Sequence, residues 1–289
     1  MHPDGWHLTD DIDAFLDRAG GFLRSRPALH TTPLTALEKA RAGGAGPPGA
    51  DPAEFGWWQD GDGVGAFFYR LGGRRLYLTA VSPGQADALA ARLSGLGSSL
   101  PGVLADRDTA AAFARAWQRR TGAAATPGGW RVRLHRLGGL TAPGPVPAGR
   151  ARVAGPGDRE RVVRWCRDFC VDVGEQESID AIDAGNWAQT RFGDKGFTFW
   201  ETPDGTPASM AGTTPMVAGM VRVDPVSTPA HLRGRGYAGA VTVEVSRAAL
   251  AAGATDVVLF ADPGNPTSTA LYRRIGYVPL ADFTVYAFS

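Results

Sequence analysis

The order of apolar and polar positions predicts alternating helices and strands in the first half of the chain. Apolar residues recur at helical spacing in residues 9–23, 30–39, 83–96 and 109–121. Strand-like runs cover residues 55–59, 63–71, 74–81, 103–104 and 130–137, and Asp60-Gly61 and Gly72-Gly73 mark hairpin turns between the first three runs. This half is therefore predicted to be an α/β unit with an antiparallel meander.

The second half repeats this organisation after a break rich in proline and glycine. Strands are predicted at residues 151–154, 197–201, 207–214, 219–226 and 257–261, with a helix starting at Asp158 and another following Ala238. Residues 138–149 (GGLTAPGPVPAG) hold too many prolines for a regular element. The predicted domains are residues 1–140 and 150–289, joined by a linker at residues 141–149.

Composition indicates a globular chain without a strong preference for charged partners. Hydrophobic residues make up 44% of the chain and charged residues 20%, and the net charge is +1. A nearly neutral chain has no global attraction for nucleic acid or anionic membranes. The sequence shows no signal peptide and no apolar run of about twenty residues, so a soluble, cytoplasmic protein is expected.

The cysteine content argues against a disulfide or a metal site. Cys166 and Cys170 lie four residues apart in a predicted helix, which does not suit an ordinary disulfide, and no histidine lies near them. Two buried thiols and no bound metal are expected.

The most informative stretch runs from Met220 to Leu250. It contains a valine-rich strand, a turn with Gly234 and Gly236, and a helix with a regular apolar stripe. The first N–H groups of a helix have no partner inside it, and the helix dipole is positive there. Glycines let the backbone approach a phosphate, and Arg233 and Arg235 add positive charge. The turn is interpreted as a cradle for a pyrophosphate.

Spacing alone does not identify this cradle. The pattern R-x-x-G-x-[GA] also begins at Arg41, Arg92, Arg119 and Arg152. Only the copy at Arg233 has a strand before it, a helix after it and no obstructing acid.

A second motif follows the cradle and leads to a family resemblance. After the apolar strand at residues 257–260 the sequence reads Asn265, Ser268, Leu271-Tyr272 and Gly276-Tyr277 at the spacing N-x-x-S-x-x-L-Y-x-x-x-G-[FY]. Together the two segments resemble the GNAT acyltransferases, which hold the pyrophosphate of acetyl-CoA on such a turn. The resemblance implies tandem GNAT-like domains of α/β (α+β) class. Each would have a mixed, mostly antiparallel sheet flanked by helices.

The first half has the element order of a GNAT domain but a different turn. Its segment SPGQAD has no arginine at the cradle position, and Asp87 falls in the first turn of the following helix. A degenerate GNAT-like domain is expected, with a generic α/β domain as the alternative.

The resemblance assigns the cofactor contacts, with acetyl-CoA or another acyl-CoA as co-substrate. Two parallel strands must splay, so that the pantetheine arm pairs with free backbone groups of the first strand. The implied contacts are Val226, Ser227, Thr228, Arg233, Gly234, Arg235, Gly236, Tyr237, Ala238, Asn265, Ser268 and Tyr272. Capping of the following helix is an alternative role for Asn265 and for Ser268.

The resemblance also implies direct attack of an amine on the thioester. Tyr272 is the expected proton donor to the leaving thiolate, or else packs on the cofactor. Asp224 is the first candidate for the base, with Glu175 and Glu201 as rivals; a bulge or turn role for Asp224 is the alternative. The acidic segment at residues 172–182, expected between helices, is predicted to hold a cationic amine through Asp172, Glu175 and Glu177. The alternative is that this segment is simply a solvated acidic face.

Three functions stay open on these residues. The first is acetyl-CoA-dependent N-acetylation of a small-molecule amine. The second is transfer from aminoacyl-tRNA, as in other tandem GNAT-like proteins, although the sequence has no dense run of Lys and Arg. The third is non-catalytic sensing of acyl-CoA, which gives no role to a proton donor at Tyr272.

Overall fold

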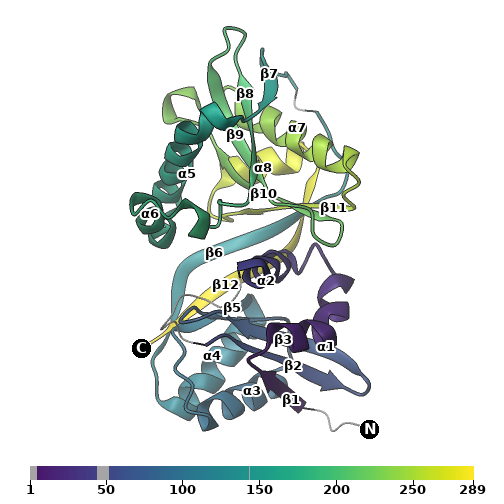
Figure 1. Cartoon of the computed structure of the whole chain (residues 1–289), viewed down its shortest axis with the longest axis vertical. Helices are drawn as coiled ribbons and strands as arrows, with labels where there is room; N and C mark the ends of the chain where they lie inside the picture. The colour runs from purple at the N-terminus through teal and green to yellow at the C-terminus, as the bar shows by residue number, and fades with distance from the viewer. Residues whose placement is uncertain (1–4, 44–51, 143) are drawn as a thin grey trace. The chain divides into compact units, whose positions relative to one another are not determined.

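The computed structural model describes residues 5–43, 52–142 and 144–289, and the chain divides into two compact units (Figure 1). Unit 1 comprises Met1–Leu134 and Leu280–Ser289, and unit 2 comprises His135–Pro279. Both units combine helices with a sheet.

Unit 1 contains a sheet with the strand order β1-β2-β3-β4-β5-β12. These strands are β1 (Gly5–Thr9), β2 (Glu54–Asp60), β3 (Gly63–Arg70), β4 (Leu76–Leu78), β5 (Gly102–Asp106) and β12 (Tyr277–Phe288). Strands β4 and β5 pair in parallel, and the other neighbours are antiparallel. The antiparallel meander predicted from the hairpin signals is confirmed.

The helices of unit 1 are α1 (Ile12–Ser25), α2 (Thr31–Gly43), α3 (Pro83–Gly95) and α4 (Arg107–Thr121). Each was predicted within a few residues. Strand β1 was not predicted, although Trp6 and Leu8 alternate with His7 and Thr9 as in a half-buried strand. The C-terminal Phe288 packs against Phe113 and Trp117 of α4, with ring centroids 6.4 and 5.9 Å away.

Unit 2 contains a sheet in which the end of β6 lies beside β11 and the order continues β11-β10-β9-β8-β7. The strands are β6 (Ala125–Leu137), β7 (Arg150–Val153), β8 (Gly196–Glu201), β9 (Pro207–Thr213), β10 (Met220–Ser227) and β11 (Asp256–Ala261). Strands β10 and β11 are parallel, and each neighbouring pair from β7 to β10 is antiparallel.

The helices of unit 2 are α5 (Arg159–Val173), α6 (Gln176–Asp183), α7 (Tyr237–Ala251) and α8 (Pro266–Arg274). Short 3-10 turns lie at η1 (Pro156–Asp158), η2 (Trp187–Gln189) and η3 (Ala230–Leu232). The acidic segment expected between helices is therefore largely helix α6, because Ile179 and Ile182 supply a buried stripe. That helix ends at Asp183.

The domain boundaries differ from the predicted ones. Leu140, the last residue of the first predicted domain, packs on the core of unit 2, and the N–H of Thr141 in the predicted linker donates to the carbonyl of Ile275. Leu280–Ser289 belongs to unit 1 because β12 pairs with β5 from Phe283 onwards. Unit 2 runs from His135 to Pro279, whereas the second predicted domain runs from residue 150 to residue 289. Residue 143 of the predicted linker lies outside the described residues.

Both cysteines are free and buried, as predicted. Burial raises the pKa of the Cys166 thiol well above its usual value and that of Cys170 to about 12, so both remain protonated. Neither forms part of a reactive site.

Candidate functional site

Strands β10 and β11 separate at their carboxyl ends, as predicted. Their parallel pairing runs from Met220 beside Asp256 to Val223 beside Leu259 and stops there. Strand β10 continues to Ser227, and its Val226 and Ser227 remain paired with β9 on the other side. The side of this strand end that faces β11 is therefore open to an extended ligand, which is the geometry expected for Val226 and Ser227; the carbonyl of Thr228 accepts from Arg233 instead.

The start of helix α7 forms an exposed turn with unpaired donors. Gly234 and Gly236 have φ of +78° and +84°, a conformation that a side chain rarely adopts, and Gly236 is an N-cap without a side-chain hydrogen bond. The first intrahelical hydrogen bond joins the N–H of Ala240 to the carbonyl of Gly236. Within the described part of the chain, the N–H groups of Tyr237 and Ala238 donate to nothing, so they can receive an anion.

The two arginines of the turn, Arg233 and Arg235, are exposed, and each donates hydrogen bonds to nearby groups. Arg233 Nε donates to the carbonyl of Thr228 at 2.9 Å, and its Nη2 donates to Asp172 at 2.5 Å. Arg235 donates to the carbonyl of His231 at 3.2 Å. Asp172, predicted to hold an amine, instead pairs with an arginine of the cradle.

The corresponding helix start in unit 1 is capped by its own side chains. Ser82 Oγ accepts from the N–H of Gln85, the Gln85 side chain accepts from the N–H of Ser82, and Pro83 has no N–H. Asp87 is exposed and pairs with Arg119 and Arg120. This geometry fits the prediction that unit 1 lacks the pyrophosphate cradle.

Asn265 and Ser268 lie at the start of helix α8. Asn265 is the N-cap: its side chain accepts from the N–H of Ser268 at 3.1 Å, while Ser268 Oγ donates to the carbonyl of Asn265. Capping is therefore the structural role of Asn265 and not of Ser268. Asn265 is exposed and Ser268 half-buried.

Tyr272 projects from α8 into the core of unit 2. It is 8% exposed, and its ring meets that of Tyr277 edge-on at 6.1 Å. Burial raises the pKa of Tyr272 to about 12, and the negative charge of Asp224 adds to this effect. The phenol stays protonated at neutral pH, as a proton donor must.

Asp224 sits at the point where β10 and β11 separate and is enclosed by cations. Its Oδ2 accepts from Arg191 and from Lys195. Although burial opposes the charged form, Arg191, Lys195 and Arg222 hold the pKa of Asp224 well below its usual range. A carboxylate so stabilised is a poor proton acceptor, which argues against the predicted role of Asp224 as the base.

Glu175 is held by the same network. Arg191 Nε donates to both of its carboxylate oxygens, at 2.9 and 2.8 Å, and Ser178 Oγ donates to Oε1. The guanidinium of Arg191 thus bridges Glu175 and Asp224. The rival Glu201 is buried and accepts from Arg152 at 2.6 Å. Four of the carboxylates predicted as bases or amine ligands are thus paired with the protein's own cations: Asp172, Glu175, Glu201 and Asp224.

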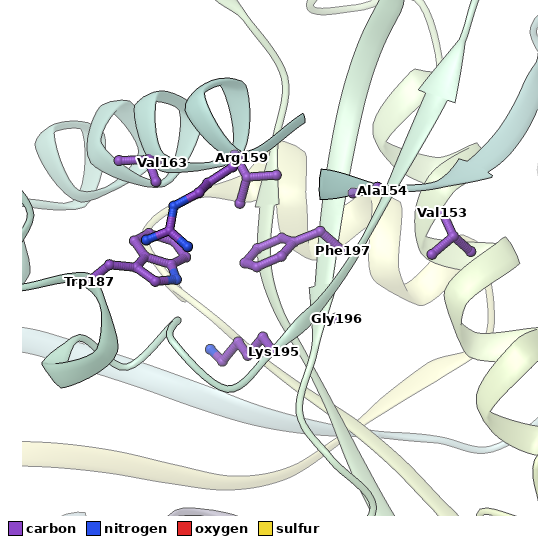
Figure 2. A pocket seen from close by; sticks show the side chains of 10 residues that line it. Val153, Ala154, Arg159, Val163, Trp187, Lys195, Gly196 and Phe197 are labelled. Atoms are coloured by element: carbon purple, nitrogen blue, oxygen red, sulfur yellow. The ribbon is translucent and has the colours of Figure 1, made fainter. Parts of the chain in front are cut away.

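Lys195 was not predicted as a functional residue. Its side chain is 1% exposed, and burial lowers its pKa to about 8, with Arg191 contributing repulsion and Asp224 opposing the shift. It also lines a hollow of about 230 Å³ between α5, η2 and β8 (Figure 2). No local pattern indicates this role, since Lys195 and Asp224 are 29 residues apart in the chain and lie in no common motif.

The described residues contain neither a membrane-spanning helix nor a metal-binding cluster. No helix among them is both long and apolar enough to cross a membrane. In the same residues, no group of three or more His, Cys, Asp or Glu side chains is arranged to hold a metal ion.

One family model matches the chain, that of the FR47-like proteins, over residues 214–285. This range contains β10, the cradle, α8 and most of β12. The comparison with curated proteins found no match.

Solved structures match the chain along nearly its full length. A GCN5-related N-acetyltransferase from Sphaerobacter thermophilus is 17% identical with a TM-score of 0.58, covering 99% of this chain and 96% of its own. One from Kribbella flavida is 19% identical with a TM-score of 0.53, covering 88% and 93%. A tandem GNAT protein from the clavulanic acid biosynthesis pathway is 14% identical with a TM-score of 0.56, covering 98% of each chain.

At these identities the solved structures establish the fold, and they confirm the predicted tandem architecture. The FR47-like match adds a sequence signal in the part of unit 2 that carries the cradle. Together these findings show that the chain has a GNAT-like fold and that unit 2 carries a segment similar to the FR47-like proteins.

Proposed function

We propose that unit 2 binds an acyl-CoA, with acetyl-CoA as the first candidate, and transfers its acyl group to a small-molecule amine in the cytoplasm. The observation that carries this proposal is the open start of α7 beside the splayed end of β10. Tyr237 and Ala238 offer free N–H groups, and the backbone of Val226 and Ser227 is unpaired on the side facing β11. A pyrophosphate on the turn and a pantetheine arm along β10 fit both features.

The cradle residues have distinct roles in this proposal. Gly234, Gly236, Tyr237 and Ala238 present the backbone to the pyrophosphate, while Arg235 and Arg233 supply positive charge. Arg233 exchanges its contact with Asp172 for the phosphate. Asn265 and Ser268 hold the start of α8, so that Tyr272 is presented from its second turn.

When bound, the acyl-CoA supplies a thioester carbon for attack and a sulfur that leaves as a thiolate. Tyr272 donates its phenolic proton to that leaving group; its pKa of about 12 keeps the phenol protonated at neutral pH but also makes it a weaker acid than an ordinary tyrosine. The core of unit 2 around Tyr272 excludes water from the donor.

The attacking amine must lose a proton, and we assign its acceptor to Lys195 instead of Asp224. Lys195 lies against Asp224 at the strand separation, and a pKa near 8 leaves a useful fraction of neutral amine at neutral pH. Asp224 and Arg191 then act as positioning residues: Asp224 holds Lys195 and stabilises its protonated form, and Arg191 fixes Asp224.

The test is transfer itself. The purified full chain is incubated with acetyl-CoA and a panel of amines, and thiol release and acetylated product are measured. Product that disappears in Arg233→Ala with Gly236→Asp supports the proposal. The matched control is Arg247→Ala with Gly253→Asp, at the opposite end of α7, where Gly253 also has a positive φ of +95°. Binding of acetyl-CoA without any product would favour a sensor, and product only with aminoacyl-tRNA would favour the tRNA-dependent reaction.

A further inference from the structure

The hollow beside Lys195 has a lining with an unusual charge balance. It is formed by Val153, Ala154, Gly155, Arg159, Val162, Val163, Trp187, Lys195, Gly196 and Phe197. The lining contains two cationic side chains and no carboxylate. It lies entirely within unit 2.

The two cations of the hollow differ in their partners. Lys195 pairs with Asp224, and Arg191 pairs with both Asp224 and Glu175, so this network balances two cations with two carboxylates. Arg159 is exposed and forms no ion pair with any residue that the structure describes. Figure 2 shows its side chain extending from the start of α5 toward Trp187. One positive charge at the hollow is left without a counter-ion.

The carboxylate that immediately precedes Arg159 in the chain is already engaged. Asp158 accepts from both terminal nitrogens of Arg152, at 2.7 and 2.9 Å, and from the N–H of Gly155 at 2.8 Å. It does not line the hollow and does not pair with Arg159.

The remaining walls of the hollow are apolar and aromatic. The Trp187 and Phe197 rings are tilted with centroids 6.3 Å apart, and Val153 is 74% exposed at the rim. An apolar ligand group that covers the exposed Val153 side chain would remove apolar surface from water, which is favourable. Aromatic and branched apolar groups therefore fit the walls, and an anion fits the guanidinium, which binds carboxylates through a two-pronged contact.

We infer that this hollow is the acceptor subsite, and that it selects an amine that also carries a carboxylate and an aromatic or branched apolar side chain, as in an amino acid. The inference rests on the proposed acyl transfer to an amine. The carboxylate binds Arg159, the apolar group lies against Trp187 and Phe197, and the amine faces Lys195 at the strand separation.

The inference is tested with two probes that differ only in charge. The full chain is titrated with 3-phenylpropionate and with 3-phenylpropionamide by calorimetry, in the absence of acyl-CoA. We expect the carboxylate to bind about tenfold more tightly than the amide, as for a charge-assisted contact. Arg159→Gln should bring the two affinities together, and Trp187→Leu should weaken both probes.

A matched control lies on the same helix. Arg164 is exposed on α5, does not line the hollow, and undergoes the same loss of charge in Arg164→Gln without an expected effect on either probe. Equal binding of the two probes to the wild-type chain, no binding of either, or an unchanged preference in Arg159→Gln would each overturn the inference. Because the probes need no acyl-CoA, this result is independent of whether acetyl-CoA binds the cradle.

Discussion

At the scale of single residues, Asp224 illustrates how neighbours decide the role of a carboxylate. Alone on a strand end it would be a reasonable base, but Arg191 and Lys195 bind the same oxygen and stabilise its charged form. The group in this cluster that changes its protonation near neutral pH is then the lysine. The chemistry of the site follows from the pairing more than from the identity of any one residue.

The first prediction concerns the pH dependence of turnover. Catalysis needs neutral Lys195, and because its pKa is lowered to about 8, the neutral fraction grows as pH rises through that value. We predict about a tenfold increase in kcat/KM between pH 7 and pH 9. Lys195→Met should lack this increase, so the ratio of wild-type to variant activity, which cancels titration of the acceptor, should itself rise about tenfold from pH 7 to pH 9. A constant ratio across this range would remove Lys195 from the base role.

The second prediction concerns the phenol of Tyr272. Tyr272→Phe should lower kcat about 100-fold while leaving acetyl-CoA affinity within about twofold, because the proton is needed only in the transition state. The loss should be the same up to about pH 10, since the pKa of Tyr272 is raised to about 12. Tyr277→Phe is the control: its hydroxyl pairs with Ser246 at 2.7 Å and serves the core. Equal kcat in Tyr272→Phe and the wild type would show that Tyr272 only packs.

At the scale of elements, helix α5 is anchored at its start by an ion network. Arg152 of β7 binds both Asp158, which precedes the helix, and Glu201 of β8. Hydrogen bonds from Arg152 lower the pKa of Asp158 to about 2. This network fixes the end of the helix from which Arg159 extends.

The third prediction follows from that lowered pKa. A carboxyl whose folded pKa is depressed stabilises the fold above its unfolded pKa, and the contribution is lost as pH falls from about 4 toward 2. Asp158→Asn should lower the free energy of unfolding by about 1–2 kcal/mol at pH 7. Urea unfolding should show this difference shrinking below pH 4. Asp168→Asn, at an exposed position of the same helix, should have little effect, and a pH-independent loss in Asp158→Asn would contradict the account.

Much of this element structure was predictable, because its signals are local. The cradle is a contiguous strand, turn and helix, and the spacing of Asn265 to Tyr272 fits one short helix. The partners of Asp224 were not predictable, since Arg191 and Lys195 precede it by 33 and 29 residues and reach it only through the fold. For the same reason Asp172 and Glu175 appeared to be free acids in the sequence.

At the scale of the whole molecule, the two ends of the chain belong to the same unit. Leu280–Ser289 completes unit 1, and β12 pairs with β5 through Phe283 to Ala287. The sequence did not indicate this, because long-range strand pairing leaves no local signal and the linker alone suggested a clean division. Arg133 strengthens the arrangement within unit 1, donating to Asp282 at 2.6 and 2.9 Å.

The fourth prediction tests the contribution of this last strand to unit 1. Phe288→Ala removes a ring that packs on Trp117 and Phe113, so unit 1 should lose about 2 kcal/mol of stability. Hydrogen exchange should report faster opening of α4, while amides of α7 keep their protection. Equal acceleration in α4 and α7 would show that the two units do not unfold separately.

The fifth prediction addresses the central claim, that unit 2 binds acyl-CoA on the turn before α7. Acetyl-CoA is titrated by calorimetry into the wild-type chain, into Arg233→Ala with Gly236→Asp, and into Arg247→Ala with Gly253→Asp. We predict one-site binding to the wild type and to the second variant. The first variant should bind at least about 100-fold more weakly, because its new carboxylate faces the pyrophosphate. Absence of binding to the wild type, or unchanged binding to the first variant, would contradict the assignment of this turn.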